Sequence, residues 1–159
     1  MESKKLEITY TVYPYDELPA NDKKLVDAAK AATRRSYAPY SHFHVGAAAM
    51  MADGTIITGT NQENAAYPSG LCAERTTLFY ANSQYPDLAV ETVAIAAYNS
   101  DDFTANPITP CGACRQVFLE CEERQKRPIR IILYGKREIL VLNGIASLLP
   151  FVFTSDYLQ

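Results

Sequence analysis

The sequence predicts an α/β fold in which helices cover a mixed sheet, and three observations support this. The chain has 159 residues, a length that suits one domain, with no internal repeat, low-complexity tract or linker. Hydrophobic residues make up 48% and charged residues 21%, which is enough to build a core without disulfide bonds. Segments with helical periodicity alternate with short apolar runs, as in a sheet layered by helices.

The first quarter of the chain predicts a short strand followed by a helix. Weak alternation over residues 8–12 indicates a strand before Pro14. Asn21 is a favourable N-cap for a helix that runs to about Tyr37, and Pro39 ends it. This helix has one apolar stripe that can face a core, made of Leu25, Ala28, Ala29 and Ala32.

The next segments predict a β-hairpin, a loop and the remaining helices and strands. Two apolar runs, 43–51 and 55–58, flank Asp53-Gly54, which predicts a two-residue hairpin turn. Residues 60–71 contain Asn, Pro and Gly and indicate a loop. We expect Leu78 and Phe79 to point inward from the helix that follows. The later elements are a helix from Cys72 to about Ser83, a strand at 90–98, a loop at 99–110, a helix from Gly112 to about Glu123, strands at 129–134 and 138–142, and a short helix at 145–149.

Charge and hydropathy exclude several classes of protein. The formal net charge is −3 and the pI about 5.4, which argues against a protein that binds nucleic acid along its phosphates. No segment approaches the roughly 20 apolar residues of a membrane span. The first residues lack the pattern of a signal peptide. We therefore expect a cytoplasmic protein whose four cysteines stay reduced and serve as metal ligands or catalysts.

Three of the cysteines stand at predicted helix starts. Cys72 opens one helix, and Cys111 and Cys114 lie at the start of the next. The free N–H groups and the positive dipole end of a helix favour thiolate over thiol. Two converging helix starts would therefore present three thiolates to one cation. Three protein ligands are typical of catalytic zinc, because the fourth position stays open for water.

Glu74 stands two residues after Cys72, where a carboxylate can move protons without binding the metal. A Cys or His ligand, a Glu two residues later and a Pro-Cys-x-x-Cys stretch together form the pattern of zinc deaminases. Three thiolates leave the site one charge more negative than a His-Cys-Cys set. A nearby cation that hydrogen-bonds the sulfurs would offset this, and we favour Arg75 over Arg115 for that role.

Several residues near these motifs have simpler interpretations. Cys121 lies seven residues after Cys114 on the same helical face, and we favour a buried small hydrophobic residue over a fourth ligand. His42 and His44 lack metal spacing to a cysteine, and we interpret both as surface or rim residues. Phe43, on a strand, is a core residue by default. Residues 61 and 63 alternate on an extended loop, so both side chains could point the same way.

From about residue 21 onward, the chain resembles the cytidine deaminase family. The resemblance is specific, because it includes both cysteine motifs together with an asparagine- and glutamate-bearing loop. The matching stretches are 40–48 (YSHFHVGAA), 61–68 (NQENAAYP), 71–76 (LCAERT), 110–117 (PCGACRQV) and 148–150 (LLP), with Phe153 and Asp156.

The resemblance implies a three-layer α-β-α fold with a mixed five-stranded sheet over residues 21–159, and makes residues 1–20 an N-terminal extension. It implies zinc-dependent hydrolytic deamination of cytidine and deoxycytidine to uridine and deoxyuridine, with release of ammonia, in pyrimidine salvage. One zinc ion per subunit would be held by Cys72, Cys111 and Cys114. The partner would be a small nucleoside, with neither nucleic acid nor membrane involved.

The resemblance also assigns roles to residues of the site. Asn61 and Glu63 would hold the ribose 3′-hydroxyl, and Phe43 would pack beside the nucleoside. Glu74, as the catalytic residue, and the backbone of Ala73 would recognise the pyrimidine edge.

Family members with cysteine as the first ligand are typically homotetramers with shared active sites. Tyr67 and Phe153 would then reach into the pocket of an adjacent subunit. The run Phe151-Val152-Phe153 offers two aromatic rings, and we choose Phe153 because of its spacing after Pro150.

Other functions remain open at this point. A deaminase for another aminated heterocycle is the nearest alternative, although the Asn-x-Glu-Asn loop favours a simple nucleoside. A deoxycytidylate deaminase would need a basic cluster for the 5′-phosphate, and an editing enzyme would need a basic channel. A structural zinc protein would have four cysteine ligands and no need of Glu74.

Overall fold

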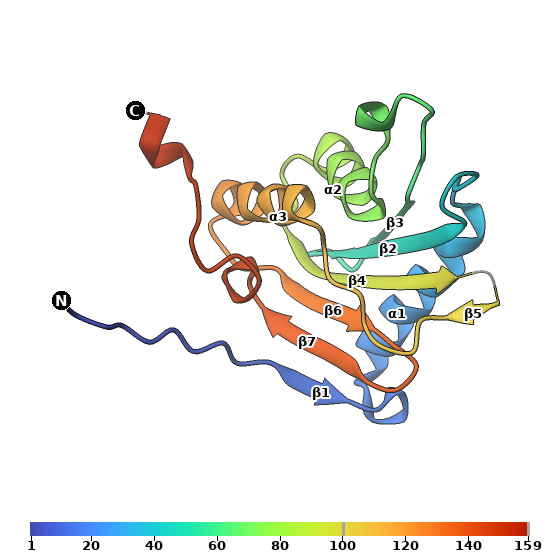
Figure 1. Cartoon of the computed structure of the whole chain (residues 1–159), viewed down its shortest axis with the longest axis horizontal. Coiled ribbons are helices and arrows are strands. Elements are labelled where there is room, and N and C mark those ends of the chain that lie inside the picture. Colours follow the sequence, from blue (N-terminus) through green and yellow to red (C-terminus); the bar gives the residue numbers. More distant parts are fainter. Residues whose placement is uncertain (100, 159) are drawn as a thin grey trace.

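A mixed seven-stranded sheet runs through the molecule (Figure 1). The computed structural model describes residues 1–99 and 101–158. The strand order is β1-β7-β6-β4-β2-β3, with β5 paired to β4; β4 and β6 are parallel and the other pairs antiparallel. The strands are β1 (Thr11–Tyr13), β2 (Phe43–Met51), β3 (Ile56–Thr60), β4 (Val90–Asn99), β5 (Asp102–Phe103), β6 (Arg130–Tyr134) and β7 (Ile139–Asn143).

The mixed α/β fold is confirmed, but the sheet has two strands more than the five expected. The difference comes from two short elements, β1 and β5, of three and two residues. β1 lies before the first helix and extends the sheet by pairing with β7. β5 folds back onto the end of β4 within the region predicted as a loop.

Helices cover both faces of the sheet, which gives the three layers. The helix α1 (Ala20–Ala32) packs on one face, and α2 (Ala73–Gln84) and α3 (Gly112–Gln125) lie side by side on the other (Figure 1). Alternation along β2 serves both layers, since Ala47 and Ala49 belong to the core under α2 and α3, while Ala48 faces α1. In the described part of the chain, no helix combines the length and the apolar character needed to cross a membrane.

The helix starts agree with the sequence at α2 and α3 but not at α1. Cys72 and Cys111 are the N-cap residues of α2 and α3. The N-cap of α1 is Pro19, so the prediction of Asn21 is wrong by two positions. Asp22, in the first turn, instead forms a two-pronged ion pair with Arg130 of β6 at 2.5 and 2.6 Å. This pair ties the start of α1 to the sheet.

Three local predictions need correction. The hairpin turn has three residues, 52–54, because Gly54 adopts φ +86° and forms a bulge after the turn. Phe79 is 48% exposed, since the buried stripe of α2 runs through Thr77, Leu78 and Ala81. The last predicted helix is shorter than expected, with a single 3-10 turn at Ile145–Ser147.

Two glycines let helices lie against the sheet. A Cβ added to Gly46 of β2 would lie 2.1 Å from the carbonyl oxygen of Ala29 in α1. One added to Gly59 of β3 would lie 2.4 Å from the hydroxyl of Thr77 in α2. Both helices therefore approach the sheet more closely than a side chain permits.

We expect Gly46→Ala to lower the free energy of unfolding by about 3 kcal/mol, because the backbone of α1 has to move away from β2. Urea unfolding followed by circular dichroism measures this. Gly112→Ala is the matched control, since an added Cβ there meets nothing within 4 Å. A Gly46→Ala protein within about 0.5 kcal/mol of the wild type would contradict the close packing of α1.

Candidate metal centre

The N-termini of α2 and α3 converge and bring three thiols together. Cys72 and Cys111 cap the two helices in extended conformation, and Cys114 lies in the first turn of α3. The Sγ atoms of Cys72 and Cys111 are 3.7 Å apart, and those of Cys111 and Cys114 are 3.5 Å apart. All three sulfurs lie within 4.8 Å of one another. Two helix dipoles therefore direct their positive ends at one cluster of thiols.

This donor set fits one zinc ion. Two sulfurs bound at about 2.3 Å in tetrahedral geometry lie about 3.8 Å apart, close to the distances found here. The hydrogen bond with Cys114 and the guanidinium of Arg75 lower the pKa of Cys72 to about 5. The same hydrogen bond, together with burial, raises the pKa of Cys114. A thiolate at Cys72 therefore disfavours a second thiolate at Cys114. A divalent cation between the sulfurs would let all three thiols ionise.

Arg75 lies beside the thiols. Its Nη2 atom is 3.9 Å from Sγ of Cys72, and this contact raises the pKa of the guanidinium. Its Nε atom is buried and lacks a partner among the described residues. Arg115, the alternative, directs its guanidinium at the carbonyl oxygens of Pro110 and Leu148 instead.

Glu74 is a buried carboxyl beside the thiols. Only 4% of the residue is exposed, and this burial raises its pKa to about 7, opposed by hydrogen bonds from its own backbone and from Cys114. The neighbouring Ala73 is fully buried. At neutral pH such a carboxyl is near the midpoint of its titration, so it can both accept and donate a proton.

A cleft of about 500 Å³ opens next to the thiols. Its floor is the loop after β3, which Gln62 fixes by two backbone hydrogen bonds with Leu71, at 2.9 and 3.0 Å. Cys72 and Arg75 border one end. The other lining residues include Tyr40, Ser41, Asn61, Glu63 and Tyr67.

The side chains of Asn61 and Glu63 are held by the backbone of the preceding segment. Asn61 accepts a hydrogen bond from N–H of Val45 and donates one to the carbonyl of Phe43, each at 2.8 Å. Glu63 accepts from N–H of Tyr40 at 2.9 Å and also from Ser41, and these bonds lower the pKa of its carboxyl. One amide hydrogen of Asn61 and further lone pairs of Glu63 remain available to a ligand.

The aromatic residues predicted for the site do not all gather at the cleft. Tyr67 lies at its rim, 77% exposed, with its ring near that of Tyr40. Phe43 is half-buried and packs against the core under α2 and α3. Phe153 is 57% exposed, stacks on Tyr157 and is absent from the cleft lining.

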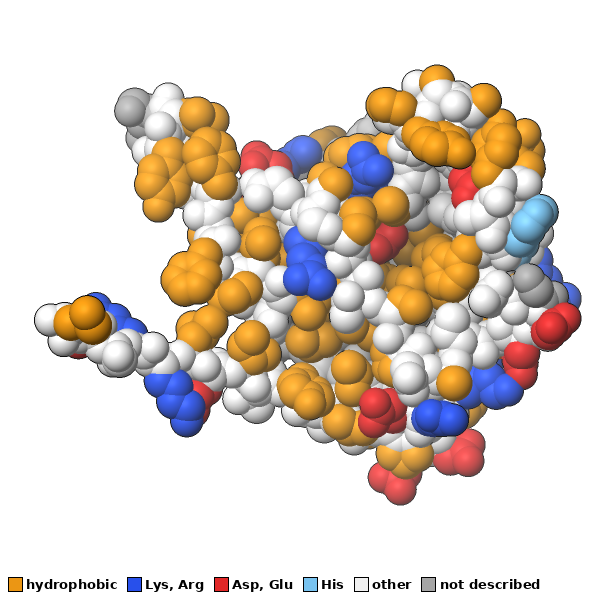
Figure 2. Space-filling view, in the orientation of Figure 1, with side chains coloured by type: hydrophobic (Ala, Val, Ile, Leu, Met, Phe, Trp, Pro, Cys, Tyr) orange, Lys and Arg blue, Asp and Glu red, His pale blue; other side chains and the backbone are white. Residues whose placement is uncertain are grey.

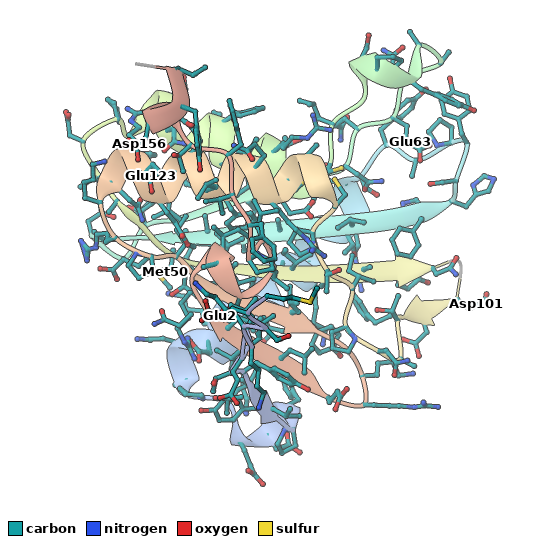
Figure 3. All side chains as sticks on the ribbon, turned by 60° about the vertical axis from the view of Figure 1, so that its left-hand side comes forward. Glu2, Met50, Glu63, Asp101, Glu123 and Asp156 are labelled. Atoms are coloured by element: carbon teal, nitrogen blue, oxygen red, sulfur yellow. The ribbon has the colours of Figure 1, made fainter. Side chains whose placement is uncertain are left out.

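The C-terminal segment lies far from the cleft of its own chain. Figure 3 shows Glu63 beside the start of β2, whereas Asp156 lies at the opposite end of the helical layer. Figure 1 agrees, since the C-terminus lies on the side of α3 away from the loop after β3. Hydrophobic side chains project from this segment and from the N-terminal one (Figure 2).

The simpler interpretations of the remaining candidates agree with their surroundings. Cys121 is buried in α3 and accepts a hydrogen bond from Asn82 at 3.1 Å, away from the thiol cluster. His44 lies 2.6 Å from the hydroxyl of Ser36, and His42 is exposed. A second cavity, of about 580 Å³, lies along β1 and β7 and contains none of the cysteines.

Sequence reasoning missed Ser41 and the contacts of Arg115. Ser41 adds a hydroxyl and an N–H to the set of donors that hold Glu63. The sequence signal for Ser41 is its position two residues before Phe43, within the stretch 40–48. The partner of Arg115 at Leu148 lies 33 residues away in sequence, and no local pattern indicates that contact.

Known proteins are similar to this chain in sequence and in fold. A family model for the cytidine and deoxycytidylate deaminase zinc-binding region matches residues 19–127. The chain is 42% identical to the cytidine deaminase of Halalkalibacterium halodurans over 133 residues, covering 83% of this chain and 93% of that protein. It is 39% identical to that of Sporosarcina psychrophila over 138 residues, with 86% and 94% covered. The crystal structure of cytidine deaminase from Burkholderia pseudomallei matches with a TM-score of 0.68 at 39% identity, covering 82% and 97%.

We expect Cys111→Ser to remove the bound zinc, because two thiols no longer close a three-ligand site. Zinc released into a chromogenic chelator under denaturing conditions gives the metal content per chain. Cys121→Ala is the matched control and should bind as much zinc as the wild type, since Cys121 lies outside the cluster. Equal loss of zinc in both variants would show that Cys121 is also a ligand.

Proposed function

Because the chain belongs to the cytidine and deoxycytidylate deaminase family, we propose that it hydrolyses cytidine and deoxycytidine to uridine and deoxyuridine. The observation that carries this proposal is one arrangement: three thiols within 4.8 Å, next to a buried carboxyl and at the edge of a cleft of about 500 Å³. A structural zinc site would have four protein ligands and no use for a buried acid.

In this proposal Cys72, Cys111 and Cys114 hold zinc, which supplies Lewis-acid activation of water at neutral pH. Glu74 takes a proton from the attacking water, whose oxygen forms a bond to C4 of the pyrimidine. Glu74 passes that proton to N3. It then takes the second proton from the new C4 hydroxyl and delivers it to the amine, so the C4–N bond breaks, ammonia leaves and a C4 keto group remains. A pKa of about 7 suits a group that both removes and returns a proton.

The cleft positions the nucleoside for this reaction. Asn61 and Glu63 are fixed by the backbone, so their remaining hydrogen-bonding groups can hold the ribose 3′-hydroxyl at little further entropic cost. The backbone of Ala73 accompanies Glu74 at the pyrimidine edge. Phe43 packs beside the nucleoside. Arg75, 3.9 Å from the sulfur of Cys72, withdraws charge from the thiolates.

We further propose that the enzyme is a homotetramer in which neighbouring copies complete each cleft. Tyr67 is 77% exposed at the rim of the cleft, and Phe153 is 57% exposed on a segment far from it. A Phe153 ring that stacks on a base must therefore belong to a different copy from the cleft. A cytoplasmic location and a role in pyrimidine salvage fit an enzyme with reduced thiols and a free nucleoside as substrate.

We expect Glu74→Gln to lower kcat for cytidine by about 10²–10⁴-fold, because an amide cannot transfer the protons. Ammonia release from cytidine and deoxycytidine measures this, and zinc content should be unchanged. Absence of turnover by the zinc-loaded wild type would overturn the cytidine assignment. Turnover of another aminated heterocycle or of deoxycytidylate would then identify a different deaminase.

We expect Phe153→Ala to raise KM for cytidine about tenfold, because aromatic stacking on a base contributes about 1–3 kcal/mol. Mixing Phe153→Ala with Glu74→Gln subunits should restore low-KM activity, since the second variant supplies the aromatic ring to a cleft that retains Glu74. A mixture of Glu74→Gln with Cys111→Ser should stay inactive, because both changes damage the subunit's own cleft. Equal results from the two mixtures would exclude a shared site.

A further inference from the structure

Arg115, the residue after the third thiol, connects two segments that are distant in sequence. Its Nε atom donates to the carbonyl of Pro110 at 2.8 Å, and Nη1 donates to the carbonyl of Leu148 at 2.6 Å. Nη2 donates to the hydroxyl of Thr109 at 3.2 Å. The planar guanidinium therefore uses three nitrogens at once, a geometry that a lysine ammonium cannot reproduce.

One of these segments carries a metal ligand and the other is the root of the C-terminal segment. Pro110 directly precedes Cys111, so a bond to its carbonyl fixes the approach to the first thiol of α3. Leu148 follows the 3-10 turn at Ile145–Ser147, and beyond it the chain leaves the domain. Gln116 holds this segment further along, since its Nε2 atom donates to the carbonyl of Phe153 at 3.0 Å.

Beyond Leu149, the C-terminal segment is held by polar bonds rather than by apolar packing. Leu148 and Leu149 are partly buried against the core, but Phe151 and Phe153 are 89% and 57% exposed. A segment with so little buried area has weak intrinsic order. Its position relative to α3 depends on the bonds from Arg115 and Gln116, which belong to the same helix turn as Cys114.

We propose that Arg115 and Gln116 are positioning residues that order the C-terminal segment, residues 148–158, together with the loop that carries Cys111. The consequence for catalysis rests on the proposed function, in which Phe153 stacks on a base in a neighbouring copy. A formed metal centre in one copy then fixes the aromatic ring that the next copy uses. Loss of metal from one cleft thus weakens substrate binding in another.

Limited proteolysis with chymotrypsin tests the coupling without any activity measurement, because Phe151, Phe153 and Tyr157 are exposed in the single chain and become cleavable in an assembly when the segment detaches. We expect a chelator to speed cleavage of this segment in the wild type about tenfold, since the loop before Cys111 loses its anchor. In Arg115→Gln, cleavage should already be as fast before chelation as it is in the chelated wild type, and the chelator should not change it. The effects of the chelator and of the substitution on the cleavage rate are thus not additive. If Arg115 merely stabilises the fold, the two effects should add.

Arg124→Gln is the matched control, because Arg124 lies in the same helix and binds only the carbonyl of Pro86, at 3.2 Å, among its described contacts. Its cleavage should match the wild type with and without chelator. Arg115→Lys, which keeps the charge but loses the fork, should resemble Arg115→Gln. Urea midpoints of all variants identify any protein that has simply unfolded, and Gln116→Ala, which leaves Arg115 intact, then decides the question.

The effect on kinetics is measured with Gln116→Ala. We expect its KM for cytidine to rise about tenfold, while kcat stays within about twofold of the wild type and the zinc content is unchanged. Unchanged cleavage in both Arg115→Gln and Gln116→Ala would overturn the proposal. If the wild type fails to turn over cytidine, the proposed function fails, while the proteolysis comparison still decides the coupling.

Discussion

The site depends on an electrostatic constraint: three thiols within 4.8 Å of one another cannot all ionise without a cation between them. The fold creates this crowding by laying α2 and α3 side by side on one face of the sheet, with their N-termini together. Each helix start contributes a positive dipole end, and Arg75 adds a full charge next to Cys72. The unfavourable proximity of the sulfurs is thus what makes the site selective for a divalent, thiophilic metal.

The cleft beside the thiols is built from side chains that have already satisfied part of their hydrogen-bonding capacity. Asn61 spans two backbone groups of β2, and Glu63 collects donors from Tyr40 and Ser41. Such groups have little freedom left to lose when a ligand arrives. The rigidity of Asn61 and Glu63 contrasts with the C-terminal segment, whose exposed rings we propose to be ordered through Arg115 and Gln116.

Sequence reasoning captured the features that local chemistry determines. The starts of α2 and α3 follow from short-range signals, and the three thiols lie at these two helix starts. The errors arose where a neighbour in space decides the outcome. The N-cap of α1 is Pro19, two residues before Asn21, and a bulge at Gly54 lengthened the hairpin turn by one residue. The bond from Arg115 to Leu148 depends on how the chain returns after β7, which no local pattern encodes.

The order of the ligands along the chain has a consequence for synthesis on the ribosome. All three thiols have been made once Cys114 emerges, before β6 and β7 exist. β1 is synthesised first, but it cannot pair at the sheet edge until β7 has been synthesised. A nascent chain that ends at Gln125 therefore carries all three thiols while two of the seven strands are missing. Metal capture can precede closure of the domain, and it then acts as a nucleus around which the later strands assemble.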